Sequence, residues 1–84
     1  HKDAIKRIKQ SEAARLRNRI NRSKMRNQIK RVREAVASGN VADAQAQLRE
    51  ATSIIHSIAH KGVIHRNQAA RRISRLNKAV KAIA

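Results

Sequence analysis

The chain of 84 residues has no cysteine, no proline and no aromatic residue, and it has only two glycines. Without cysteine it can form neither a disulfide framework nor a cysteine-ligated zinc site. Without Phe, Tyr or Trp it cannot stack unpaired bases as sequence-specific readers of single-stranded RNA do. Its apolar runs are only a few residues long, which excludes a transmembrane helix and a signal-peptide core. The chain begins with His rather than Met, so we expect a few residues to precede it.

Positive charge is what the sequence has in excess. Lysine and arginine together number 21 against 5 acidic residues, a formal net charge of +16. Residues 1–34 carry thirteen basic and three acidic groups, residues 35–60 carry one and two, and residues 61–84 carry seven and none. So much like charge repels itself in a compact chain unless a polyanion neutralises it. Nucleic acid is therefore the partner that the composition predicts.

The two glycines divide the chain into three helical segments. We predict helices over about residues 3–37, 41–61 and 66–83, with turns at Gly39 and Gly62 that close the helices before them. Asp3, Asn40 and Asn67 are the predicted N-caps, since their side chains can accept a bond from a free backbone N–H. Short turns make neighbouring helices antiparallel. The predicted fold is all-α: one domain of residues 1–84, an antiparallel three-helix bundle with an overlong, highly basic first helix.

Apolar residues spaced by three and four predict which helix faces are buried. The second segment has one continuous stripe, and so does the third, whose stripe comprises Ala69, Ile73, Leu76, Val80 and Ile83. The first segment has two apolar groups on nearly opposite faces: Ile5, Ile8, Leu16 and Ile20, then Met25, Ile29, Val32 and Val36. We therefore expect its second half to pack in the bundle and part of its first half to project beyond the other helices.

Arginine clusters are the candidate binding residues. Like charges at i,i+4 destabilise a helix, and Arg15, Arg17, Arg19 and Arg22 follow one another with no acidic residue between them. We interpret them as a phosphate-binding surface rather than an ordinary solvated face, because the guanidinium group suits bidentate phosphate contact. The predicted RNA-binding residues are Lys6, Arg7, Lys9, Arg15, Arg17, Asn18, Arg19, Arg22, Ser23, Arg26, Lys61, His65, Arg66, Asn67, Arg71, Arg72, Ser74, Arg75 and Lys78.

Other polar residues allow a second interpretation. His56 and His60 have metal-compatible spacing, but no third ligand is near in sequence, so we interpret them as surface residues. His65 is as consistent with a local role at the start of the third helix as with RNA contact. Short polar side chains could add hydrogen bonds beside the arginines, but most of them suit surface or capping roles at least as well: Asn18, Asn21, Ser23, Asn67, Ser74 and Asn77. No catalytic arrangement is visible, so we predict no enzyme activity, no cofactor, no metal and no small-molecule substrate.

Three runs resemble a known family: Gln10-Ser11-Glu12 with Arg15-Leu16-Arg17-Asn18-Arg19, then residues 61–72, KGVIHRNQAARR, then Ser74-Arg75-Leu76. Along essentially its whole length the chain resembles bacterial small-subunit ribosomal protein twenty. The resemblance implies a three-helix bundle that binds small-subunit ribosomal RNA directly, early in subunit assembly, in the cytoplasm. It also implies other components of the small subunit as neighbours.

Two other functions are compatible with a basic helical chain. A small chromosome-organising DNA-binding protein is the first, although such proteins often use proline or apolar wedges in the minor groove, and this chain has no proline. A membrane-active basic helix is the second, but such helices favour Trp, Phe or Leu on the apolar face. This chain has only three leucines and no aromatic residue, so we expect no membrane partner.

Overall fold

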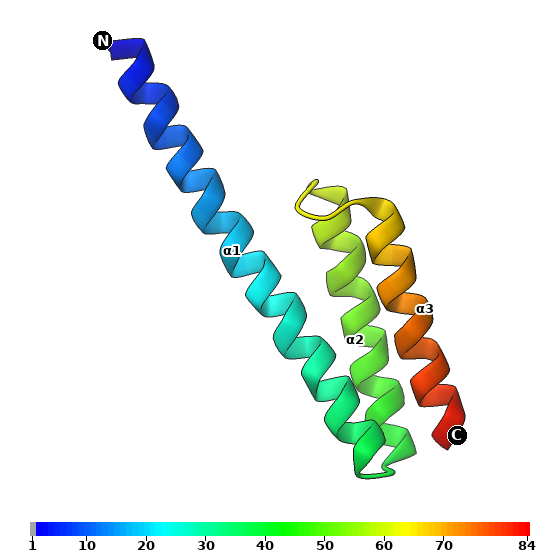
Figure 1. The fold of residues 1–84 in the computed structure, drawn as a ribbon. Coiled ribbons are helices and arrows are strands. Elements are labelled where there is room, and N and C mark those ends of the chain that lie inside the picture. The colour runs from blue at the N-terminus through cyan, green and yellow to red at the C-terminus, as the bar shows by residue number, and fades with distance from the viewer. Residues whose placement is uncertain (1) are drawn as a thin grey trace.

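The structure, a computed structural model, describes residues 2–84 and consists of three helices with no strand in that range. They are α1 (Lys2–Ala37), α2 (Val41–His60) and α3 (Arg66–Ile83), each within one residue of its predicted bounds. The chain runs along α1, back along α2 and forward again along α3 (Figure 1). The predicted antiparallel three-helix bundle is confirmed. Helix α2 packs on both α1 and α3, while α1 and α3 contact each other least.

Helix α1 makes the molecule elongated. Its 36 residues extend over about 54 Å at 1.5 Å per residue. The molecule measures 59 × 21 × 14 Å, and its radius of gyration is 16.3 Å. A compact chain of this length would have a radius of gyration of about 12 Å. The N-terminal half of α1 leans away from α2 and α3 and extends past them, as predicted (Figure 1).

The hydrophobic core lies where all three helices overlap. It is built from Met25, Ile29, Val32 and Ala35 of α1, together with Ala44, Ala51, Ile55, Ile58, Ile64, Ala69, Leu76 and Val80. The apolar residues in the first half of α1 take no part in it. Ile5, Ile8, Leu16 and Ile20 are 52–57% exposed. The predicted reversal of the apolar face along α1 is therefore confirmed, because a straight helix cannot present both groups to one bundle.

Both turns are closed by a glycine with positive φ, 72° at Gly39 and 79° at Gly62. After α2, the N–H of Gly62 donates to the carbonyl of Ala59 at 3.0 Å and the N–H of Val63 to that of Ile58 at 3.2 Å. After α1, Gly39 and Asn40 bond in the same way to Val36 and Ala35. These paired bonds form the Schellman motif, which satisfies carbonyls that would otherwise lack a partner at a helix end.

The N-cap predictions have a mixed outcome. Asn40 caps α2, since its Oδ1 accepts from the N–H of Asp43 at 3.1 Å. Asp3 is not a cap, because α1 already begins at Lys2 and Asp3 lies in its first turn. The Asn67 prediction is wrong: Asn67 lies inside α3, and the cap is His65, whose Nδ1 accepts from the N–H of Asn67 at 3.1 Å. An imidazole can replace a carboxamide here because a neutral ring carries one acceptor nitrogen.

Candidate nucleic-acid interface

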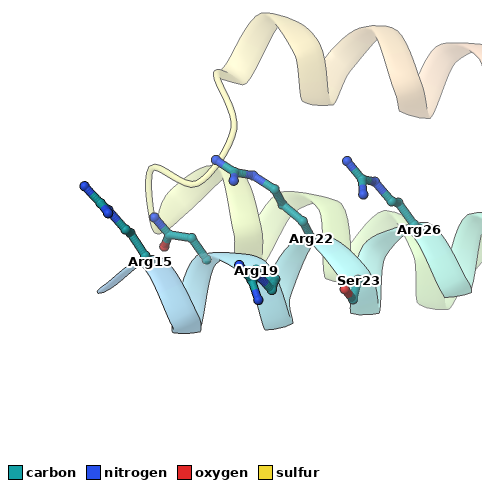
Figure 2. A pocket seen from close by; sticks show the side chains of 6 residues that line it. Arg15, Arg19, Arg22, Ser23 and Arg26 are labelled. Carbon is teal, nitrogen blue, oxygen red and sulfur yellow. The ribbon is translucent and has the colours of Figure 1, made fainter. Parts of the chain in front are cut away.

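A row of predicted residues on α1 forms the first part of the site. Arg15, Asn18, Arg19, Arg22, Ser23 and Arg26 line one hollow, which we call the arginine hollow (Figure 2). Their spacing of three and four residues places them on adjoining turns of one helix side. Arg22 and Arg26 extend from α1 toward the side on which α3 lies (Figure 2). Apart from the half-buried Asn18, the members are exposed.

These arginines have no carboxylate partner. Within residues 2–84 the one ion pair joins Lys30 Nζ to Glu34 at 4.0 Å, one turn apart on α1 and largely exposed. Such a surface pair contributes little to stability. The guanidinium groups of the arginine hollow are therefore free to bind an external anion, and their mutual repulsion favours one.

A second part of the site brings α1 and α3 together. Arg33 of α1 lies with Arg72 and Arg75 of α3 around a small hollow whose apolar lining is Ile29 and Leu76, here called the α1–α3 groove. The Nε of Arg72 is buried and makes no hydrogen bond within the protein. Three guanidinium groups on an apolar lining, with no acidic residue among them, suit a phosphate oxygen cluster.

A third part lies where α1 passes the turn between α2 and α3. Arg17 and Asn18 of α1 and Lys61 of the turn line a cleft whose other members are Ala14, Asn21 and Val63. We call it the turn cleft. On this side of α1, Ala14, Asn18 and Asn21 are half-buried. Residues of both basic segments of the sequence, Arg17 and Lys61, therefore line one cleft.

The remaining predicted residues lie apart from these three places. Lys6 and Lys9 share a hollow with Ile5 near the N-terminal end of α1. Ser74 and Lys78 line a different hollow, together with His56 of α2. The exposed residues Arg7, Arg66, Asn67 and Arg71 line none of these hollows. The predicted set therefore covers several surfaces.

The histidines have identifiable surroundings. His65 caps α3 through Nδ1, so the structure supports the local role for this ring atom. His56 and His60 are exposed on α2. In the described part of the chain, no group of three or more His, Cys, Asp or Glu side chains could hold a metal ion.

The predicted RNA-binding set omits two polar residues of these surfaces, Arg33 and Asn21, although Asn21 is among the short polar residues that could add hydrogen bonds beside the arginines. Arg33 follows Arg26 by seven residues, which keeps it on the same side of α1, so the periodicity of the arginines could have found it. Its proximity to Arg72 and Arg75 depends on how α1 and α3 cross, which no local pattern encodes. Asn21 follows Asn18 and Arg17 by three and four residues, and the same spacing could have placed it in the turn cleft.

Fold and surface together define a small all-helical protein with unpaired arginines gathered over two helices. None of the helices in residues 2–84 is both long and apolar enough to cross a membrane. The family model described as Ribosomal protein S20 matches residues 1–81. The chain belongs to this family.

Named relatives agree with this match over nearly the full length. Small ribosomal subunit protein bS20 of Magnetococcus marinus is 52% identical over 84 residues, covering 100% of this chain and 91% of the relative. The protein of the same name from Desulfatibacillum aliphaticivorans is 48% identical, covering 100% and 96%. That from Syntrophobacter fumaroxidans is 43% identical over 83 residues, covering 99% and 96%.

Family membership decides the broad class of function. The protein is a structural constituent of the ribosome and has its place with the ribosome in the cytoplasm. A ribosomal structural protein also agrees with the prediction that this chain is not an enzyme.

Proposed function

We propose that the protein binds small-subunit ribosomal RNA directly and supports early assembly of the small subunit, acting as a single three-helix RNA-binding domain. The observation that carries the proposal is the α1–α3 groove, where Arg33, Arg72 and Arg75 converge from two helices without an acidic partner. The relatives are named as small ribosomal subunit proteins, which supports the choice of RNA.

The proposed mode of binding is contact with phosphate and sugar. The chain has no aromatic side chain on which unpaired bases could stack. Arginine in the arginine hollow and the α1–α3 groove offers planar, bidentate contacts to phosphate oxygens. Such contacts read no base-sequence information. They position a protein on the shape of a folded RNA backbone instead. The RNA it binds is therefore folded and largely double-stranded.

Competition binding tests the proposal. The full chain should bind a folded small-subunit ribosomal RNA fragment more tightly than random duplex DNA of equal length. Its affinity should fall with salt, with a log–log slope of about 0.7 to 0.9 per phosphate contact, because each contact releases counterions. Equal affinity for both nucleic acids would favour the chromosome-organising alternative. A flat salt response would contradict phosphate binding altogether.

Charge-removing variants localise the binding. Replacing Arg15, Arg17 and Arg19 together by Gln should weaken RNA binding while the bundle stays folded, since all three are exposed. The single replacement Arg19→Gln is matched by Arg49→Gln, which removes the same charge from the exposed surface of α2. The Arg49→Gln control should lower RNA affinity much less than Arg19→Gln does. Melting of the bundle in the triple variant would show that these arginines are structural.

Reconstitution of small subunits tests the role in assembly. Particles assembled without the protein, or with the triple variant, should accumulate as incomplete intermediates. Adding the protein only after the other components are in place should rescue them less well than adding it at the start. Equal rescue at either time would contradict an early role.

A further inference from the structure

An apolar stripe on the outside of α1 is left uncovered by the fold. Ile5, Ile8, Leu16 and Ile20 are the exposed large hydrophobic residues of the described chain. At 100° per residue they fall within about 120° of the helix, on the face opposite the one that Met25 and Val32 bury further along. We call these four residues the outer stripe. Over its 15 residue steps it is about 22 Å long.

Cations border the outer stripe on both sides. In the helical projection, Arg15 and Arg22 follow one edge, and Lys6 and Lys24 follow the other; all four are exposed. Three exposed charged residues lie within the stripe itself: Lys9, Glu12 and Arg19. The face therefore presents positive charge at both edges and apolar groups between them, interrupted by two cations and one carboxylate.

We propose that this face lies in the minor groove of a double-stranded segment of the RNA, an assignment that rests on the proposed function. The minor groove of an A-form helix is wide and shallow and displays ribose 2′-hydroxyls between its two phosphate strands. The edge cations then meet the two phosphate strands. The apolar side chains cover ribose carbons, and the Glu12 carboxylate accepts a hydrogen bond that a 2′-hydroxyl donates.

Charge argues against two other occupants of the outer stripe, a second copy of the chain and a membrane. A second copy of the chain also carries a net charge of +16, and pairing the two stripes would bring both sets of edge cations together. An anionic membrane suits the cations, but insertion of the stripe would bury Glu12 in an apolar medium at a high desolvation cost. A double-stranded RNA groove combines anions at the edges with hydrogen-bond donors in the middle.

The test is the full chain carrying Ile8→Gln and Leu16→Gln, which keeps charge and helix propensity while removing apolar contact. Its affinity for a folded ribosomal RNA fragment should fall by about tenfold, from the lost burial of two large side chains. The salt slope should stay unchanged because no cation is removed. The matched control, Ala46→Gln on the exposed surface of α2, should bind as the unaltered chain does.

A second variant tests the role assigned to Glu12. We compare binding to an RNA duplex and to a DNA duplex of the same sequence, since only the RNA carries 2′-hydroxyls. Glu12→Ala removes one negative charge, which raises affinity for both duplexes alike. The ratio of RNA to DNA affinity should nevertheless fall severalfold. An unchanged ratio would overturn the assigned contact of Glu12 with a 2′-hydroxyl.

The outcomes separate this inference from the proposed function. If the unaltered chain shows no preference for ribosomal RNA, the proposed function fails. If it shows that preference and the Gln double variant binds equally well, only the placement of the outer stripe is overturned. The placement is also overturned if the double variant binds RNA normally but loses self-association in sedimentation, binding to vesicles of anionic phospholipid, or incorporation into small subunits.

Discussion

The side chain of Gln28 on α1 donates both of its amide hydrogens to Gln47 on α2. Its Nε2 lies 2.8 Å from Gln47 Oε1 and 3.1 Å from the Gln47 backbone oxygen. Arg31 donates to the Gln28 Oε1 at 3.4 Å, so both ends of the buried amide have partners. Gln28 is 2% exposed and is the one polar residue buried in the core of the described chain. Because both acceptors belong to one residue, the pair fixes the register of α1 against α2.

Replacing Gln28 by Ala should destabilise the bundle by about 1–3 kcal/mol. The loss combines the hydrogen bonds to Gln47 with the cavity left at a buried site. Chemical denaturation followed by circular dichroism measures the change. The control, Gln45→Ala on the exposed side of α2, should stay within about 0.5 kcal/mol. Equal effects of both variants would mean that the Gln28–Gln47 contact does not hold the two helices together.

Replacing Gly62 by Ala should cost about 1 kcal/mol of stability, from the backbone alone. The residue has φ = 79°, which side chains with a Cβ rarely adopt, yet a Cβ built there has no neighbour within 4 Å. Gly62→Asn should cost less, because Asn tolerates this conformation. Thermal melting of the two variants measures the difference. A Gly62→Asn variant that is no more stable than Gly62→Ala would argue against a conformational origin.

Replacing His65 by Ala should reduce stability by about 1 kcal/mol through the loss of the N-cap bond to Asn67. His65→Asn should recover most of that loss, since a carboxamide oxygen also accepts from the backbone. Comparing these two variants separates the capping role of His65 from an RNA contact. RNA affinity that stays low in His65→Asn while stability returns would assign His65 an RNA contact as well. Full recovery of both would leave capping as its only role.

Replacing Arg22 by Gln should stabilise the free protein while weakening the complex. Arg22 and Arg26 are like charges at i,i+4 on α1, so removing one relieves repulsion. The melting temperature at low salt should rise by about 1–2 °C, and salt should abolish the gain. RNA affinity, measured in the same buffer, should fall. If melting temperature and RNA affinity both rose, or both fell, the result would contradict a surface whose repulsion is relieved by a bound polyanion.

Local patterns predicted most of the fold because its signals are local. The two glycines mark the helix ends, and the spacing of Leu, Ile and Ala marks the buried faces of α2 and α3. Even the reversal along α1 follows from residue positions on one helix. The buried Gln28 could not be predicted in this way, since its partner lies 19 residues away and a lone polar residue resembles a surface position.

The candidate site was less predictable than the fold. Sequence identified the arginines of the arginine hollow, because their spacing lies within one helix. It did not show that Arg33 meets Arg72 and Arg75, which depends on the crossing of two helices with weak mutual contact. The capping role of His65 was only one of two open interpretations, because imidazole is uncommon at this position and the preference of Asn for it pointed to Asn67.

Because the buried face reverses along α1, only its C-terminal half is anchored in the core. The N-terminal half, here called the arm, takes no part in the core. A solitary helix of about twenty residues is only marginally stable in water. Repulsion between neighbouring arginines destabilises the arm further. Amide hydrogens near Ile8 and Leu16 should therefore exchange with deuterium far faster than those near Met25 and Val32 in the free protein. A polyanion that neutralises the arm also stabilises its helix, so binding and the stability of the arm are thermodynamically linked. Under the proposed function, an RNA whose shape leaves the arm without contacts does not gain this stabilisation.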